Sequence, residues 1–281
     1  MVDLGSGEWL DANRVQWDER VPLHLDSEFY DQSQLKSGAG RLTPIDEVEL
    51  AVLFPDGVDG RRILHLQCHF GADTLVLAQR GATVVGVDFS KPAIVAAREL
   101  AAEVNLSANS RFINANIYDL RHTLPEPESF DVVFTTWGTI GWLPDVAEWA
   151  KIIAWYLKPG GVLYFADGHP AAFMFDNDAA GEPVLAYPYD NDGSPIVLEE
   201  GSDYADEAAT LQNTRTFEWT HPVSEIVTAL LDAGLRIDSL HEHYSVPWKM
   251  FESLTKIGEG MFAWPESKRM PLGLSITASQ A

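Results

Sequence analysis

The stretch that decides the fold runs from residue 63 to residue 90 and reads ILHLQCHFGADTLVLAQRGATVVGVDFS. Residues 63–66 form a short, mostly apolar run typical of a buried strand, and residues 83–87 form a second, β-branched run that stops at Asp88. Between them a short loop turns at Gly71 into a helical segment that ends near Gly81. The stretch therefore predicts a strand–helix–strand unit with two parallel strands.

The same alternation continues along the chain. Apolar runs predict strands at 111–115, 130–135, 162–166 and 235–240, and helical spacing predicts helices from Ser90, over 144–157 and over 222–233. We expect the tetrapeptide KPGG at 158–161 to end the second of these helices. Apolar and small residues alternate over 272–277, which predicts a half-buried last strand. Too few residues precede that strand for a crossover helix, so we expect it to be antiparallel. The fold class is therefore α/β, with a mostly parallel sheet covered by helices on both faces.

Two regions lie outside this alternation. Residues 1–60 are predicted to be helical, with Trp9, Leu10, Val15 and Trp17 on one face of a first helix, and a second helix is predicted to begin at Thr43-Pro44. Residues 170–215 are rich in Asp, Gly, Pro and Tyr, and a hairpin is expected there between 184–187 and 196–198. Ligands of open α/β sheets bind beyond the carboxyl ends of the strands, so we interpret 170–215 as an insertion over that site.

Composition restricts the function mainly by exclusion. The chain has 281 residues, 46% of them hydrophobic, and a formal net charge of −23. Such a charge repels phosphate backbones and anionic lipid surfaces, so we expect neither nucleic acid nor a membrane as partner. The single cysteine, Cys68, allows no intrachain disulfide, and the sequence shows no signal peptide and no apolar run long enough to span a bilayer. These features lead us to expect a cytoplasmic protein.

The loop at 67–71 indicates which cofactor class fits. A dinucleotide needs three glycines to let the backbone close on a pyrophosphate, whereas this loop offers only Gly71. Side chains at Gln67 and His69 would crowd a pyrophosphate. S-adenosylmethionine carries no phosphate, and its carboxylate is favoured by the free amides at the start of the following helix. Asp88 can accept both ribose hydroxyls of either cofactor.

Taken together, residues 63–90, the segment FDVVF at 130–134 and the segment LKPGGVL at 157–163 resemble the motifs of the class I S-adenosylmethionine-dependent methyltransferases. The resemblance implies a Rossmann-like, seven-stranded methyltransferase sheet, with an N-terminal helical lid at 1–60 and the methyltransferase domain at 61–281. It implies S-adenosylmethionine as cofactor, methyl transfer to a small-molecule acceptor, and S-adenosylhomocysteine as product. It also implies a set of cofactor-binding residues: Tyr30, Gln67, Cys68, His69, Gly71, Asp88, Phe89, Asn116, Ile117, Thr136 and Trp137.

Within that set the resemblance distributes the roles by position. Residues 67–71 would wrap the methionine part, Phe89 would pack on the adenine, residues 116–117 would read the adenine edge, and residues 136–137 would lie beside the sulfonium. The sequence departs from the family pattern at three positions. The family usually has an acid at the positions of His65 and Asn116 and a glycine at the position of Gln67. Asn116 can still bond the adenine amine through its carbonyl oxygen.

Methyl transfer is an in-line displacement, so the enzyme needs a base only when the acceptor must lose a proton. The predicted base is His169, which follows the fifth strand directly, and Asp167 and His221 are the other candidates. Trp142, His169 and His221 are the predicted substrate contacts. His241 and His243 alternate at the end of a strand, but we predict no metal site.

Two other functions stay open at this point. A nicotinamide-dependent oxidoreductase shares the alternating fold and Asp88, although the missing glycines disfavour it. A non-catalytic S-adenosylmethionine-binding protein is the other, because His65, Gln67 and His69 are unusual. The sequence does not identify the acceptor atom, and it allows a monomer or a homodimer.

Overall fold

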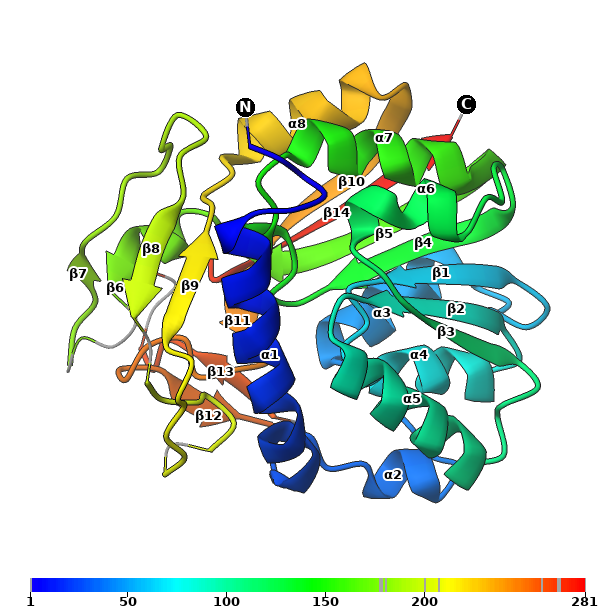
Figure 1. The fold of residues 1–281 in the computed structure, drawn as a ribbon, viewed down its shortest axis with the longest axis horizontal. Helices are drawn as coiled ribbons and strands as arrows, with labels where there is room; N and C mark the ends of the chain where they lie inside the picture. The colour runs from blue at the N-terminus through cyan, green and yellow to red at the C-terminus, as the bar shows by residue number, and fades with distance from the viewer. Residues whose placement is uncertain are drawn as a thin grey trace.

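A computed structural model describes residues 2–176, 179, 181–199, 201–206, 208–258, 260–266 and 269–280. Its centre is a seven-stranded sheet with the strand order β10-β14-β5-β4-β1-β2-β3 (Figure 1). The strands are β1 (Arg62–Leu66), β2 (Thr83–Asp88), β3 (Ser110–Asn114), β4 (Phe130–Thr136), β5 (Leu157–Gly168), β10 (Leu235–His243) and β14 (Gly273–Gln280).

The pairing of these strands confirms the predicted fold class. The pairs β1–β2, β2–β3, β1–β4 and β4–β5 are parallel, and β14 pairs antiparallel with both β5 and β10. The expectation that β14 is only half-buried was wrong, because residues 273–279 are all buried. The strand lies between two neighbours inside the sheet, and side chains of both its faces are covered.

Helices cover the two faces of the sheet, and neighbouring strand residues alternate between two cores. Leu64 and Val133 pack with helices α7 (Val146–Tyr156) and α8 (Val223–Asp232). Ile63 and Val132 pack on the other side with α3, α4 and α5. These last helices span Pro44–Leu53, Ala72–Gln79 and Lys91–Glu103. The remaining helices are α1 (Glu8–Asp26), α2 (Ser33–Lys36), α6 (Leu120–Thr123) and the short 3₁₀ turns η1 (Ile117–Asp119), η2 (Ile140–Trp142) and η3 (Ala172–Met174).

The helix starts follow the sequence signals. The hydroxyls of Thr43 and Ser90 accept hydrogen bonds from the backbone N–H groups of Asp46 and Ala93, which confirms the predicted starts of α3 and α5. The predicted end of α7 was placed too late. That helix ends at Tyr156, and the segment 158–161 belongs to β5.

Helix α1 differs from the apolar helix that the sequence suggested. Its buried face includes Asn13, Gln16, Arg20 and His24, spaced three to four residues apart, while the side chain of Val15 is 41% exposed. The prediction that Val15 shares a buried face with Trp9 was therefore wrong. A polar face is buried here because α1 packs against polar groups of two loops and of the insertion.

The hairpin predicted within the insertion was also wrong. Strand β7 (Val184–Leu185) pairs with β6 (Phe175–Asp176), and β8 (Ile196–Glu199) pairs with β9 (Arg215–Glu218). Strand β7 thus pairs with a strand that precedes it and β8 with a strand that follows it, so the two apolar runs do not pair with each other. Between β10 and β14 the chain also forms an unpredicted small sheet of β11 (Ser245–Val246), β12 (Thr255–Ile257) and β13 (Met261–Ala263).

Within the described ranges, the search for membrane spans found no helix with both the length and the apolar character that crossing a bilayer requires.

Candidate functional site

The loop between β1 and α4 forms one wall of the candidate site. Gly71 has φ +75°, and a Cβ atom there would lie 2.5 Å from Cε1 of Phe112, so both the backbone conformation and the space require glycine. Gln67 and His69 also have positive φ, at +54° and +51°, although neither is glycine. Left-handed backbone at non-glycine residues is strained, and such strain concentrates at functional sites.

Asp88 joins this loop to the loop after β2. Its Oδ2 accepts the backbone N–H of His69 and its Oδ1 accepts the backbone N–H of Ser90, both at 2.8 Å. Burial raises the pKa of this carboxyl to about 6, against the lowering effect of these two hydrogen bonds. Each carboxylate oxygen keeps a lone pair that a ligand hydroxyl can use.

The loop after β4 is organised by Asp167 at the end of β5. Its carboxylate accepts the backbone N–H groups of Gly138, Thr139 and Ile140 at 2.6 to 3.0 Å. The predicted alternative base is thus an anchor for this loop. Gln67 reaches the same loop, because its Nε2 donates to the carbonyl of Thr139 at 2.8 Å.

Thr136 and Trp137, the residues expected beside the sulfonium, lie where β4 ends and this loop begins. Thr136 is buried at the end of β4, and Trp137 has φ +54°. The indole N–H of Trp137 donates to Asp46 of α3 at 2.8 Å. Burial raises the pKa of Asp46 to about 6, although Trp137, Thr43 and Tyr164 bond the carboxylate.

Helix α1 lies across these three loops and closes the site. The ring of Trp17 makes edge contacts with the rings of His69 and Trp142, at centroid distances of 5.5 and 5.4 Å. Asp18 accepts the hydroxyl of Ser90 at 2.6 Å. These contacts join α1 to the loops after β1, β2 and β4. Figure 1 shows α1 between the main sheet and β9 of the insertion.

The insertion holds α1 from its other side. Asn13 exchanges two hydrogen bonds of 2.8 Å with the backbone of Phe217 in β9. The carboxylate of Glu19 accepts the backbone N–H groups of Gln212 and Asn213. We call α1 together with residues 196–219 the roof, and the loops after β1, β2 and β4 the floor.

Three atoms of the roof and the floor that can accept hydrogen bonds are buried without a hydrogen-bond partner among the described residues. They are Oε1 of Gln16, Oε1 of Gln67 and Nδ1 of His69. Buried polar atoms are rarely left unsatisfied, so this arrangement fits a polar ligand that brings hydrogen-bond donors. S-adenosylmethionine has such donors in its ammonium, ribose and adenine groups, and the amide oxygens of Gln16 and Gln67 therefore fit it.

The other predicted cofactor residues lie in different surroundings. The side chain of Cys68 and that of Ile117 are buried in the two cores. Phe89 packs against the core that contains Ile117. The amide of Asn116 donates to the carbonyl of Leu4 at 2.7 Å and accepts the N–H of Tyr118 at 3.2 Å, so it has a protein partner at each end.

Tyr30, expected near the cofactor, meets the site from the segment after α1. Its ring stacks on His24 at 4.8 Å and makes edge contacts with His69 and Phe70. Its hydroxyl is 2.5 Å from that of Tyr204 in the insertion. Burial raises the pKa of Tyr30 well above its ordinary value, so the phenol is neutral.

The histidines predicted as base and substrate contacts have structural partners. Nδ1 of His169 accepts the backbone N–H of Ala171 at 3.1 Å, and its Nε2 lies 3.3 Å from the Glu242 carboxylate. His221 lies between Glu225 at 3.0 Å and the carbonyl of Leu143 at 2.7 Å. Nδ1 of His169 is thus used by its own turn, whereas its Nε2 is buried without a hydrogen-bond partner among the described residues, and the prediction of His169 as the base stays a prediction.

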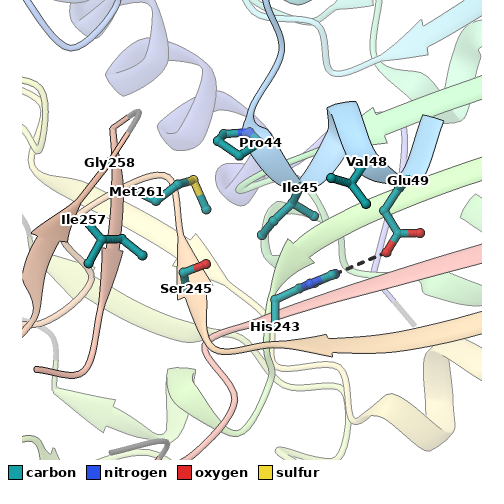
Figure 2. Close-up of a pocket in the computed structure, with 9 residues that line it drawn as sticks. All are labelled: Pro44, Ile45, Val48, Glu49, His243, Ser245, Ile257, Gly258 and Met261. Atoms are coloured by element: carbon teal, nitrogen blue, oxygen red, sulfur yellow. Dashed lines mark ion pairs between the residues drawn. The ribbon is translucent and has the colours of Figure 1, made fainter. Parts of the chain in front are cut away.

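A separate groove of about 500 Å³ lies beside α3 (Figure 2). Pro44, Ile45, Val48 and Glu49 line it from α3, together with His243, Ser245, Ile257, Gly258 and Met261. His241 and His243 face the Glu49 carboxylate, with Nδ1 of His241 2.8 Å from Oε1. No lining residue belongs to the floor loops. Among the described residues no cluster of His, Cys, Asp or Glu side chains could hold a metal ion.

Sequence reasoning missed the polar side of the roof. Asn13, Gln16, Arg20 and His24 were not considered, and neither was Asp203 of the insertion. A signal for the first four was present, because polar residues recur at helical spacing along α1. For Asp203 no local pattern exists, since its side-chain partners His24 and Arg20 lie about 180 residues away.

Comparison with known proteins agrees with this geometry. Residues 64–165 match the family described as Methyltransferase domain. A ubiquinone biosynthesis O-methyltransferase of Stutzerimonas stutzeri (strain A1501) is 31% identical over 118 residues, which cover 41% of this chain and 49% of that protein. The chain spans about half the length of the curated relatives it matches.

Solved structures extend the likeness of the fold. A putative S-adenosylmethionine-dependent methyltransferase from Listeria monocytogenes has a TM-score of 0.59 at 20% identity, over 84% of this chain and 98% of that one. Geranyl diphosphate C-methyltransferase from Streptomyces coelicolor A3(2), solved with S-adenosyl-L-homocysteine, has a TM-score of 0.56 at 14% identity, over 98% of this chain and 99% of that one. The resemblance to class I S-adenosylmethionine-dependent methyltransferases is thus confirmed: residues 64–165 match the methyltransferase domain family, and the chain has the fold of these solved methyltransferases.

Proposed function

We propose that this protein is an S-adenosylmethionine-dependent methyltransferase that acts on a small molecule. The observation that carries the proposal is the junction of the Gly71 turn with Asp88, where one carboxylate at the end of β2 is bonded to the loop after β1. This junction presents lone pairs for ribose hydroxyls beside a loop whose side chains disfavour a pyrophosphate. The matched methyltransferase domain and the O-methyltransferase relatives support the same activity.

The residues of the site have separate tasks in this proposal. Asp88 accepts the ribose hydroxyls, and Oε1 of Gln67 accepts a donor from the methionine part. When bound, S-adenosylmethionine supplies an electrophilic methyl group on its sulfonium. The floor holds the cofactor in one orientation, and the roof covers the site and excludes water from it.

The partner classes follow from charge and enclosure. The net charge of −23 disfavours nucleic acid as acceptor, and the roof disfavours a large protein substrate. We therefore propose a small-molecule acceptor and a cytoplasmic site of action. The monomer-or-homodimer expectation stays a prediction.

Calorimetry with S-adenosylhomocysteine and with NAD tests the proposal, because S-adenosylhomocysteine carries every group of the cofactor except the methyl. We expect S-adenosylhomocysteine to bind in a one-to-one ratio and NAD to give no signal. Tight binding of NAD without binding of S-adenosylhomocysteine would overturn the proposal in favour of an oxidoreductase. Binding without turnover across a broad panel of acceptors would favour a non-catalytic role.

A further inference from the structure

A chain of three buried or partly buried side chains runs from the insertion through the roof to the floor. Oδ2 of Asp203 lies 3.0 Å from Nε2 of His24, and Nδ1 of His24 lies 2.7 Å from Nε2 of His69. Nδ1 of His69 ends the chain, and it is buried without a hydrogen-bond partner in the part of the protein that the structure describes. The three residues come from segments that are far apart in sequence, so only the closed roof assembles them.

The hydrogen bonds determine where the protons lie. The pKa of Asp203 is held below its ordinary value, since bonds from His24 and Ala205 and the charge of Arg20 outweigh the effect of burial. The carboxylate therefore only accepts, and Nε2 of His24 carries the proton of their hydrogen bond. Arg20 lies 3.7 Å from the same carboxylate and balances its charge. We infer the tautomer that completes the chain, in which Nδ1 of His24 holds the lone pair and accepts from His69.

The hydrogen bond between His24 and His69 determines in the same way which nitrogen of His69 carries a proton. Since Nδ1 of His24 accepts, Nε2 of His69 carries a proton and donates it. Burial lowers the pKa of His69 well below its ordinary value, and the ring is neutral. Its remaining nitrogen, Nδ1, is thus an unshared lone pair in the closed site. The left-handed backbone at His69, φ +51°, holds the ring in this position.

We propose that Nδ1 of His69 is the proton acceptor for a methyl acceptor that carries an O–H or N–H group, and that His24 and Asp203 position it. The inference rests on the proposed methyltransferase function. As the bond from the acceptor atom to the methyl carbon forms, the bond from sulfur to that carbon breaks, and the electron pair stays on sulfur as a neutral thioether. The acceptor's proton passes to Nδ1 of His69, and the acceptor ends as a neutral ether or amine.

The chain is better suited to accept a proton than to hold the cofactor's ammonium group. An ammonium group has three N–H donors, and backbone carbonyls can accept all of them. A protonated His69 needs its charge balanced, and its Nε2–H points through His24 toward the Asp203 carboxylate. In a catalytic triad a carboxylate orients the histidine base and stabilises the imidazolium that forms. Here Asp203 would do the same for His69, with His24 between them.

The first test is calorimetry with S-adenosylhomocysteine on the wild type and on His69→Asn. Asparagine tolerates left-handed backbone and offers a polar atom near the position of Nδ1, but it cannot take a proton. We expect His69→Asn to keep the affinity within about threefold. A loss of more than about tenfold would overturn the proposal, because the nitrogen would then serve the cofactor. Failure of the wild type to bind S-adenosylhomocysteine would refute the proposed function instead.

The second test is nitrogen NMR of protein labelled with ¹⁵N-histidine, assigned with His24→Asn and His69→Asn. We expect His69 to carry its proton on Nε2 and to keep Nδ1 bare, both free and with S-adenosylhomocysteine. Asp203→Asn should change the tautomer of His24 and, through it, that of His69. A proton on Nδ1 of His69 in the wild type, or a hydrogen bond formed there when S-adenosylhomocysteine binds, would overturn the proposal.

The third test measures transfer of a radiolabelled methyl group from S-adenosylmethionine to phenols, alcohols and primary amines, and to iodide, a nucleophile without a proton. His69→Asn should lose about 100-fold or more on any O–H or N–H acceptor that is methylated, and clearly less on iodide. The exposed His122→Asn is the matched control. Equal losses on both kinds of acceptor would overturn the proposal, and if none of the panel is methylated the first two tests decide.

Discussion

The floor and the roof of the candidate site are built in different ways. The floor is local, because Gly71 and Asp88 lie 17 residues apart in sequence. The loop that contains Gly71 is joined to Asp88 by a hydrogen bond from the backbone N–H of His69. The roof is assembled from distant segments, because Asn13 bonds Phe217 and His24 bonds Asp203. A local structure is readable from a motif, whereas a distant contact depends on the whole fold. The two halves should therefore respond differently to substitution.

The largest effect is expected for Asp88→Ala in the floor. The substitution removes the acceptors proposed for two ribose hydroxyls, and hydrogen bonds to a charged group contribute about 1.5–3 kcal/mol each. Affinity for S-adenosylhomocysteine should fall roughly 100- to 1000-fold by calorimetry. The exposed acid Asp56, changed to Ala, is the control and should leave the affinity unchanged. A folded Asp88→Ala protein with wild-type affinity would remove Asp88 from the cofactor site.

Gly71→Ala tests whether the floor depends on backbone conformation and space together. The new Cβ would overlap the Phe112 ring and force a side chain into left-handed backbone, and we expect a loss of about 2–4 kcal/mol in the free energy of unfolding. Gly57→Ala is a matched control, because Gly57 has φ +80° but no atom within 4 Å of the added Cβ. It should cost only about 1 kcal/mol in urea unfolding. Equal losses would show that the contact with Phe112 is unimportant.

Asn13→Ala tests the roof separately from the floor. It leaves the N–H and C=O of Phe217 without their partner, which should cost about 1–3 kcal/mol. We expect the roof to open without unfolding of the sheet, which would give faster hydrogen exchange in α1 and residues 196–219 and unchanged protection in β1 and β4. Val15→Ala, on the exposed face of α1, should change neither. Uniform loss of protection across the sheet would contradict the division into roof and floor.

The smallest expected effect is the pH dependence of cofactor affinity, which depends on the floor alone. The pKa of Asp88 is raised from its ordinary value to about 6, so the carboxylate needed for the ribose is lost as the pH falls through 6. Affinity for S-adenosylhomocysteine should fall by up to about tenfold between pH 7 and pH 5. The contribution of Asp88 to folding has the opposite sign, because a raised pKa makes the native state bind protons more tightly and stability declines as pH rises from about 4 to 6.

Asp88→Asn is the control for this pH dependence, since Asp46 also titrates near pH 6. In this variant the affinity should be low and flat over the same range. A pH dependence that survives in Asp88→Asn would assign it to another carboxyl group.

The accuracy of the sequence predictions follows the same division. The strands β1, β2 and β4 and the starts of α3 and α5 were predicted almost to the residue, because each depends on an apolar run or a capping residue within a few positions. The hairpin in the insertion was wrong, because the partners of β7 and β8 had to be chosen among short strands with weak patterns. The candidate base at His169 followed from its place after a strand and stays a prediction, while the structure adds that the turn at Ala171 uses the lone pair of its Nδ1.

By itself, the sequence determined the α/β class, the glycine turn at Gly71 and the carboxylate at the end of β2, because periodicity, capping and backbone sterics act over a few residues. Only the tertiary structure decided that α1 buries a polar face and that Asp203, His24 and His69 form one hydrogen-bonded chain. Side chains separated by up to 179 residues meet only after the sheet, helix α1 and the insertion have packed together. Which nitrogen of His69 keeps its lone pair depends on that packing, since each proton in the chain is placed by the next partner.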